Sequence, residues 1–356
     1  MTQKIKPINF DGTLVIHNLI TDEDDPVTAF AVDWIKAFSK IATSVLVFST
    51  HVGRFDFPPN VRVVELGGGS FRKKLLGLLR LIKGAFTVLR IPGKKIVFHH
   101  MSEKTACLIG PLYRAARLRQ GLWYSHNRQS RTLHGAIRFV DYVFSPTLNS
   151  FPVQTKKLHA VGHGIDMSRF QDPNLIERKK SGVLSLGRIS RVKNLEKIIE
   201  QLSLAQAPKP TLTFIGPLME TPDYYESLRR LAHDCQVDLR IEKTVNYRDV
   251  PREISKFSMT YSGSPNTVDK SVLEAAATGS YVLSESKFVL NLTGMDRVWE
   301  EIGAASPSEI ESQIEILKSH EENVELRKLI STVCVEKNDI NKTAAKILDE
   351  LIDYEA

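Results

Sequence analysis

Residues 184–200 read LSLGRISRVKNLEKIIE, and the architecture of the chain can be worked out from this stretch. A short apolar run ends at Gly187, basic residues follow it, and apolar residues then recur at helical spacing from Asn194. The order of strand, glycine turn and helix is that of a βα unit. Such a unit places its strand in a parallel sheet and its helix over one face of that sheet.

The same alternation of strand and helix patterns continues on both sides of this unit. Further strands are predicted at 12–19, 43–50, 61–66, 94–100, 121–126, 141–146, 158–163, 212–216, 238–244, 259–263 and 280–286. Helical patterns lie between several of them, at 26–40, 103–118, 194–205, 224–235 and 270–279. Alternation of this kind predicts an α/β protein with parallel sheets covered by helices.

The chain contains two such series, separated by the polar stretch 166–182. Its 356 residues exceed what one hydrophobic core usually supports. We therefore predict two Rossmann-like domains, residues 1–165 and 166–335, and a C-terminal helix at 336–356 that packs back toward the first. Open α/β sheets bind ligands at the carboxyl ends of their strands, so both sheets should face a central cleft.

The composition is that of a soluble globular protein, with 42% hydrophobic and 25% charged residues. No stretch reaches the roughly 18 apolar residues of a membrane-spanning helix, and the N-terminus lacks the apolar core of a signal peptide. The three cysteines have no metal-binding spacing and suit a reducing compartment. A cytoplasmic location is therefore expected.

The net charge of +7 is distributed unevenly. Residues 1–165 hold 23 Lys and Arg against 10 Asp and Glu, and residues 66–140 hold 15 against the single acid Glu103. Such a patch favours an anionic partner, although a basic face without a partner is the alternative. The aromatic residues nearby form no RNA-binding signature, so no nucleic-acid partner is expected.

Two stretches carry residues suited to a nucleotide. In the first, Arg188 and Lys193 lie five residues apart beside a helix N-terminus, where amides and the helix dipole attract anions. In the second, residues 261–286, a polar loop enters a helix near Lys270, and Glu274 follows one turn later. A carboxylate among apolar helix residues needs a partner such as a ribose diol, although a surface position is the alternative.

Together, GRISRVK at 187–193 and LEAAATGSYV at 273–282 resemble the donor-binding half of the family 4 retaining glycosyltransferases, whose GT-B fold has a glycogen-synthase-like donor domain. The resemblance extends over most of the chain, since IVFHHM, LWYSH and VGHGIDMSRF match strand ends of the first domain and the segment before the linker. The D-K pair before the L-E-A helix is similar to that of a bacterial subset of the family.

The resemblance implies roles for individual residues. Arg188 and Lys193 would hold the donor diphosphate and stabilise the charge that builds on it. Glu274 would bind the ribose, and His126 would face the donor sugar from the first domain. The amides around three residues at the helix N-terminus would meet the sugar and the distal phosphate, namely Asp269, Lys270 and Ser271.

The sequence departs from the family pattern at one donor-site position. Many relatives carry a second glutamate eight positions before the helix glutamate, and here that position is Asn266. It puts in question which groups hold the sugar hydroxyls, and it keeps open a non-catalytic GT-B subunit that scaffolds a partner enzyme.

The resemblance implies a retaining hexosyltransferase that needs no metal or other cofactor. Its substrates would be a nucleotide-diphosphate sugar and a lipid-linked or surface-polysaccharide acceptor. The acidic run Asp22–Asp25 is interpreted as a helix entry with Asp25 as the cap, and four scattered histidines lack zinc-site spacing, so no metal site is expected.

Residues 71–90, FRKKLLGLLRLIKGAFTVLR, hold six Lys and Arg and no acid. The leucines recur at helical spacing and predict an amphipathic helix that lies on an anionic membrane surface, with Arg72, Lys73 and Lys74 toward the headgroups. The alternative is an ordinary Rossmann helix whose apolar face packs on the sheet. On the first interpretation the protein is peripheral on the inner face of the cell membrane.

Overall fold

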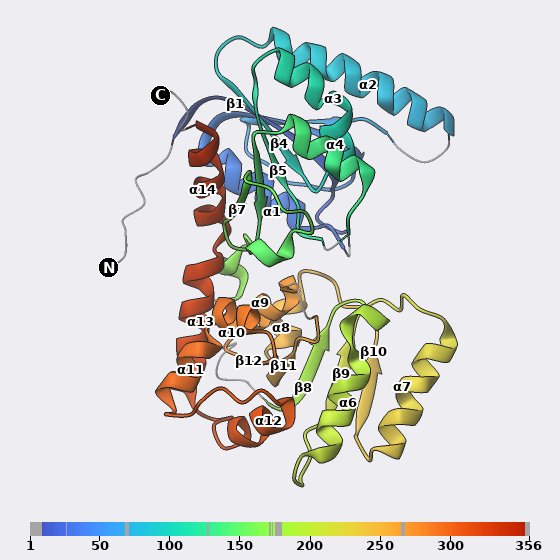
Figure 1. The fold of residues 1–356 in the computed structure, drawn as a ribbon, viewed down its shortest axis with the longest axis vertical. Coiled ribbons are helices and arrows are strands. Elements are labelled where there is room, and N and C mark those ends of the chain that lie inside the picture. The colour runs from blue at the N-terminus through green and yellow to red at the C-terminus, as the bar shows by residue number, and fades with distance from the viewer. Residues whose placement is uncertain are drawn as a thin grey trace. The chain divides into compact units, whose positions relative to one another are not determined.

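The computed structural model describes residues 9–352, apart from 26, 68–70, 127, 171, 173, 175–179 and 265–267; the side chains of 71–74 and 180–181 are also outside the description. The chain forms two compact units, Met1–Asp166 together with Asp339–Ala356, and Met167–Asn338 (Figure 1). No helix in the described ranges is long and apolar enough to cross a membrane.

The first unit is built on a parallel sheet with the order β3-β2-β1-β4-β5-β6-β7. Its strands are β1 (Phe10–Thr21), β2 (Ala42–Val52), β3 (Val61–Glu65), β4 (Lys95–His100), β5 (Arg119–Trp123), β6 (Tyr142–Ser145) and β7 (Leu158–Ala160). Its helices are α1 (Phe30–Ser39), α2 (Phe71–Arg90), α3 (Glu103–Ala115), α4 (Arg131–Phe139) and α14 (Ile340–Ile352), with the 3-10 turn η1 (Leu148–Ser150).

Both faces of this sheet are covered (Figure 1). Side chains alternate along β1, so Leu14 and Ile16 join the core beneath α1 and α14, whereas Val15 joins the core beneath α2 and α3. The C-terminal helix α14 therefore belongs to the first unit, and the backbone N–H of Ile340 donates to the carbonyl of Ile165 where the chain returns.

Helix α1 begins at Phe30, later than the sequence pattern suggests. Asp25 Oδ1 accepts the backbone N–H groups of Val27 and Thr28 at 2.9 and 2.6 Å, and it also accepts the Thr28 hydroxyl. The carboxylate thus holds a turn ahead of the helix, because short polar side chains readily replace backbone acceptors at such positions.

The second unit repeats the design with the sheet order β10-β9-β8-β11-β12. Its strands are β8 (Lys180–Leu186), β9 (Leu212–Ile215), β10 (Leu239–Glu242), β11 (Phe257–Tyr261) and β12 (Tyr281–Leu283). Its helices are α6 (Leu195–Leu204), α7 (Pro222–Asp234), α8 (Val250–Ile254), α9 (Lys270–Ala277), α10 (Lys287–Thr293), α11 (Met295–Glu301), α12 (Ile310–Lys318) and α13 (Val324–Asn338), with turns η2 (Met167–Phe170) and η3 (Arg191–Lys193). The predicted α/β class with parallel sheets is confirmed.

Three histidines lie buried toward the carboxyl ends of β1 and β4. His17, His99 and His100 are each 3% exposed or less, and the rings of His17 and His99 stack at 5.1 Å. Burial lowers the pKa of His99 to about 4 and that of His100 to about 3, and it also lowers the pKa of His17. These imidazoles are therefore neutral in the folded protein.

The buried histidines predict a loss of stability in weak acid. Below pH 6.5 the unfolded chain takes up protons on these histidines and the folded chain does not. The free energy of unfolding therefore decreases as the pH is lowered. The expected loss is about 1.4 kcal/mol per histidine for each pH unit below about 6.5. Urea unfolding from pH 7.5 to 5.0 measures it.

His99→Gln should flatten this pH dependence because it removes one buried titratable group. His134→Gln is the matched control, since His134 is an exposed residue of α4 in the same unit. Equal slopes in the two variants would contradict the assignment to the buried histidines.

Candidate functional site

The order of the strands in the second sheet reverses at β8: β9, the next strand in the chain, lies on one side of β8, and β11 lies on the other. Connections that leave two such neighbouring strands diverge, and α/β proteins bind ligands in the space this creates at the carboxyl ends. Residues 187–194 follow β8, and the segment before α9 follows β11. The two motifs of the sequence therefore meet at one edge of the sheet.

Two glycines shape the chain as it leaves β8. Gly187 has φ +136° and Gly216, after β9, has φ +153°, and a Cβ at Gly216 would overlap the carbonyl oxygen of Gly187. Only glycine permits this approach in this backbone region. With the hydrogen bond from the Ile189 N–H to the Pro217 carbonyl, this contact holds the segment that carries Arg188 against the loop after β9.

Lys193 and Asp269 form the central ion pair of the site. The Lys193 ammonium contacts Asp269 Oδ1 at 2.5 Å, and Ser264 Oγ donates to Asp269 Oδ2 at 3.0 Å. Asp269 is the N-cap residue of α9, but its carboxylate makes no capping hydrogen bond to that helix. The pair instead joins the β8 loop to the start of α9.

The positive charge of Arg188, unlike that of Lys193, is not paired with a carboxylate among the described residues. Its side chain is exposed and makes no hydrogen bond or ion pair with the described residues. A guanidinium on a fixed loop can present two parallel N–H groups to two oxygens of a phosphate. Arg188 is therefore the group at this edge best able to meet an anion directly.

Helix α9 brings two of the expected residues into an ion pair. Glu274 is only 4% exposed, so it is not the surface residue that one interpretation of the sequence allowed. Its Oε1 lies 2.9 Å from the Lys270 ammonium. Ser271 Oγ donates to the carbonyl of Leu186 at 2.6 Å and so ties α9 to the end of β8.

Sequence reasoning missed two residues beside this helix. The Lys270 ammonium lies 4.1 Å from the ring centre of Tyr247 and donates to its hydroxyl. The Arg169 guanidinium lies 4.0 Å from the centre of the same ring and donates to the Tyr247 carbonyl at 2.7 Å. Two cations on one aromatic ring give no sequence signal, because the three residues come from separate segments.

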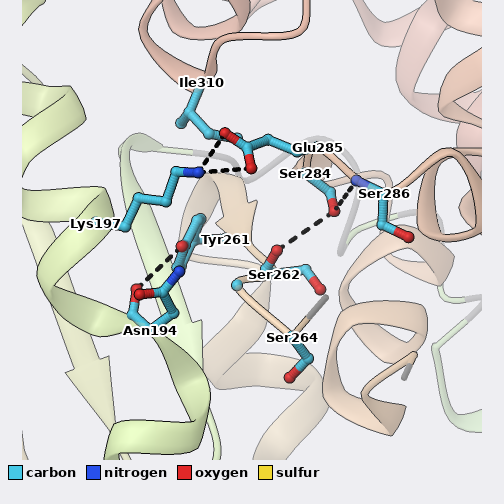
Figure 2. A pocket seen from close by; sticks show the side chains of 10 residues that line it. Asn194, Lys197, Tyr261, Ser262, Ser264, Ser284, Glu285, Ser286 and Ile310 are labelled. Atoms are coloured by element: carbon cyan, nitrogen blue, oxygen red, sulfur yellow. Dashed lines mark hydrogen bonds and ion pairs between the residues drawn. The ribbon is translucent and has the colours of Figure 1, made fainter. Parts of the chain in front are cut away.

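A pocket of about 260 Å³ adjoins this edge on the side of α6 and α12 (Figure 2). Lys197 and Glu285 pair across it at 2.6 Å, and Ser284 Oγ donates to the carbonyl of Ser262 at 3.3 Å. The hydroxyl of Tyr261 donates to the carbonyl of Asn194 at 3.1 Å. The positive charge of Lys197 is neutralised by Glu285, so the pocket offers no net charge to an anion. A diphosphate would therefore bind better at the loop that carries Arg188.

The other expected residues lie elsewhere or outside the described chain. His126 belongs to the first unit, where it follows β5 and its ring meets Tyr124 edge-on at 5.6 Å. Asn266 lies outside the described residues. Arg72, Lys73 and Lys74 are in the first turns of α2, but their side chains lie outside the description.

Among the described residues, no group of three or more His, Cys, Asp and Glu side chains is arranged to hold a metal. The acidic run after β1 has protein partners instead. The Arg54 guanidinium pairs with Glu23 at 2.9 Å and with Asp24 at 2.6 Å. The backbone N–H of Arg54 donates to Asp22 Oδ1 at 3.1 Å. These contacts hold the run against the loop after β2.

Comparison with known proteins links the chain to others through its structure. No protein-family model matches it, and no curated protein resembles it in sequence. The Anabaena protein HepE, in a crystal structure with UDP, superposes over 96% of this chain and 100% of its own, with a TM-score of 0.68 and 14% identity. HepE is a GT-B protein. The chain has the GT-B fold.

Two further solved structures superpose on nearly the whole chain. A glycosyltransferase from Rickettsia africae matches over 98% of this chain and 100% of its own, with a TM-score of 0.64 and 11% identity. The lipopolysaccharide outer core galactosyltransferase WaaB matches over 97% and 100%, with a TM-score of 0.62 and 10% identity. These identities are low, so what is shared is the GT-B fold.

The glycine contact beneath Arg188 makes a prediction for stability. Gly216→Ala should lower the free energy of unfolding by more than about 3 kcal/mol, because backbone strain adds to the overlap with Gly187. Gly303→Ala is the control: Gly303 has φ +68°, and a Cβ there would meet no atom within 4 Å. That variant should lose about 1–2 kcal/mol from backbone strain alone. Similar losses in denaturant unfolding would contradict the role of the close contact.

Proposed function

We propose that this protein is a retaining, metal-independent glycosyltransferase that moves a hexose from a nucleotide-diphosphate sugar to a lipid-linked or surface-polysaccharide acceptor. The observation that carries the proposal is the exposed Arg188 beside the Lys193–Asp269 pair, at the switch point of the second sheet of a GT-B fold. The motifs there resemble those of family 4. The GT-B neighbours add support, since HepE is seen with UDP and with UDP-glucose.

Arg188 would hold the donor diphosphate through a bidentate contact, and Lys193, positioned by Asp269, would add a second positive charge. The amides of Lys270 and Ser271 at the start of α9 would donate to the distal phosphate, where the helix dipole also favours negative charge. Charge on the diphosphate increases as the glycosidic bond breaks, so these groups would stabilise the transition state more than the ground state.

Glu274 would accept the ribose hydroxyls on its carboxylate. Its oxygen faces the Lys270 ammonium, so donor binding would exchange part of that ion pair for hydrogen bonds to the diol. His126 would contact the sugar from the first unit, and Asn266 would contact its hydroxyls. The acceptor hydroxyl would attack the face from which the diphosphate leaves, which requires no enzyme nucleophile.

Arg188→Ala should lower turnover by roughly 10²–10³, the usual cost of losing one donor to a developing anion. Its stability should be unchanged, because the side chain has no described partner. Lys193→Ala should lower both turnover and stability, since it leaves Asp269 partly buried without its cation. The measurements are turnover on a donor found by a thermal-shift screen of UDP-, GDP- and ADP-sugars, and urea unfolding.

Arg230→Ala, an exposed arginine of α7, is the control for loss of one positive charge in the same unit. Equal turnover in wild type and Arg188→Ala would exclude the proposed clamp. A protein that binds none of these nucleotides would instead be the non-catalytic scaffold.

We further propose that α2 holds the protein on an anionic membrane surface. The face of α2 on the sheet combines the buried side chains of Leu81 and Val88 with small residues: Ala85 is fully buried, and a Cβ at Gly84 would lie 2.5 Å from an atom of the Phe48 ring. Several other large apolar side chains of α2 are exposed instead. Exposed apolar residues of α2 include Leu75, Leu79, Ile82 and Phe86, which are 39–55% exposed.

The charges around this stripe favour lipid over a protein partner. Lys83 and Arg90 are exposed on α2 beside the apolar stripe, and residues 66–140 contain only one acidic residue. An apolar face flanked by basic side chains is typical of helices that lie in the membrane interface. The neighbour WaaB is a lipopolysaccharide galactosyltransferase, which is consistent with an acceptor at a membrane.

Vesicle co-sedimentation tests this attachment. Binding should require anionic lipid, weaken between about 0.1 and 0.5 M salt, and decrease when Arg72, Lys73 and Lys74 are changed to Glu. Leu75→Ser with Leu79→Ser should also weaken it, because the apolar stripe is lost. The control pair Leu19→Ser and Leu148→Ser removes two exposed leucines of the same unit outside α2. Binding that ignores lipid charge, or an equal loss in the control, would exclude this surface.

A further inference from the structure

A second pocket lies on the first unit, where β5, β6 and β7 begin. Its volume is about 250 Å³. The amino ends of parallel strands lie at the edge opposite their carboxyl ends. This pocket is therefore not at the carboxyl-end edge, where α/β sheets usually bind ligands. Its charged and titratable lining residues are Arg114, Arg119, Asp141, Tyr142, Lys156, Lys157 and His159.

The acidic groups near this pocket already have partners. Asp141 Oδ2 accepts the backbone N–H of Gln120 at 2.8 Å, and its Oδ1 is 3.9 Å from Arg114. Glu350 of α14 pairs with His159 at 3.2 Å. One carboxylate therefore faces four permanent cations in the lining, and the pocket keeps a positive excess.

The two lysines of the pocket have different surroundings. Lys157 donates to the carbonyls of Ile137 and Val140 at 2.7 and 2.6 Å, so it stabilises the carboxyl end of α4. Burial, followed by repulsion from Arg114, lowers the pKa of Lys157, and attraction to Asp141 offsets only part of this lowering. Lys156 is exposed and makes no hydrogen bond or ion pair with the rest of the described chain.

We propose that this pocket binds a phosphoryl group, carried either by a lipid headgroup or by a soluble phosphorylated compound. Arg114 and Arg119 supply planar guanidinium groups that match phosphate oxygens, and Lys156 supplies an ammonium with no other partner among the described residues. The volume is below the roughly 300–1,000 Å³ of pockets for drug-sized ligands, which fits a phosphate with few attached atoms. The inference is independent of the proposed sugar transfer.

The test uses Lys156→Glu, which changes an exposed side chain and should leave the fold intact. Inorganic phosphate is titrated at constant ionic strength into the Arg188→Ala protein, in which the proposed donor clamp is absent. Phosphate should raise the unfolding temperature in a saturable way, because a ligand of the folded state stabilises it by mass action. Adding Lys156→Glu should raise the apparent dissociation constant about ten-fold or more.

Lys94→Glu is the matched control. Lys94 is also exposed, directly precedes β4 at the same edge of the sheet, and does not line the pocket. It should change the apparent dissociation constant by less than about two-fold. Absence of a saturable phosphate effect, or an equal loss in both variants, would overturn the proposal.

Vesicles separate the two sources of phosphate. If the ligand is a headgroup, Lys156→Glu should weaken binding to phosphatidic acid vesicles more than Lys94→Glu does, and glycerol phosphate should compete. If both variants bind vesicles equally while only Lys156→Glu loses inorganic phosphate, the ligand is a soluble phosphorylated compound. The vesicle result therefore identifies the source, and the phosphate titration decides the site.

Discussion

The ion pair between Lys193 and Asp269 is the interaction on which the strand-end edge of the second unit depends. It joins residues 76 positions apart and ties the loop after β8 to the start of α9. The two side chains are 17% and 22% exposed, so solvent and salt screen the pair less than a surface pair. Ser264 donates to the other carboxylate oxygen, so the Asp269 carboxylate joins the loop after β8, the segment after β11 and the start of α9.

This arrangement gives the nearby cations different roles. Lys193 is held by Asp269, and Lys270 is shared between Glu274 and the ring of Tyr247. Arg188 remains exposed on a loop that the contact between two glycines helps to hold against the loop after β9. Charges that are already paired fix the shape of the edge, and Arg188, which makes no hydrogen bond or ion pair among the described residues, has its charge available to an anion.

The first unit has two distinct surfaces, an apolar stripe flanked by basic residues on α2 and a basic pocket. Helix α2 packs on the sheet through Leu81, Ala85 and Val88, and its other bulky apolar side chains are exposed along one stripe. The basic pocket lies instead at the amino ends of β5 to β7, where helix carbonyls also attract cations. These surfaces arise on different elements and need not have the same partner.

The sequence alone determined the α/β class and the alternation of strands and helices, because periodicity and glycine turns act over a few residues. It also singled out Arg188, Lys193 and Glu274 as candidates. Only the tertiary structure decided that Glu274 is buried against Lys270, that Tyr247 adjoins this pair, and which face of α2 meets the sheet. These outcomes depend on segments far apart in the chain that meet only when the sheets form, and local sequence patterns carry no information about such contacts.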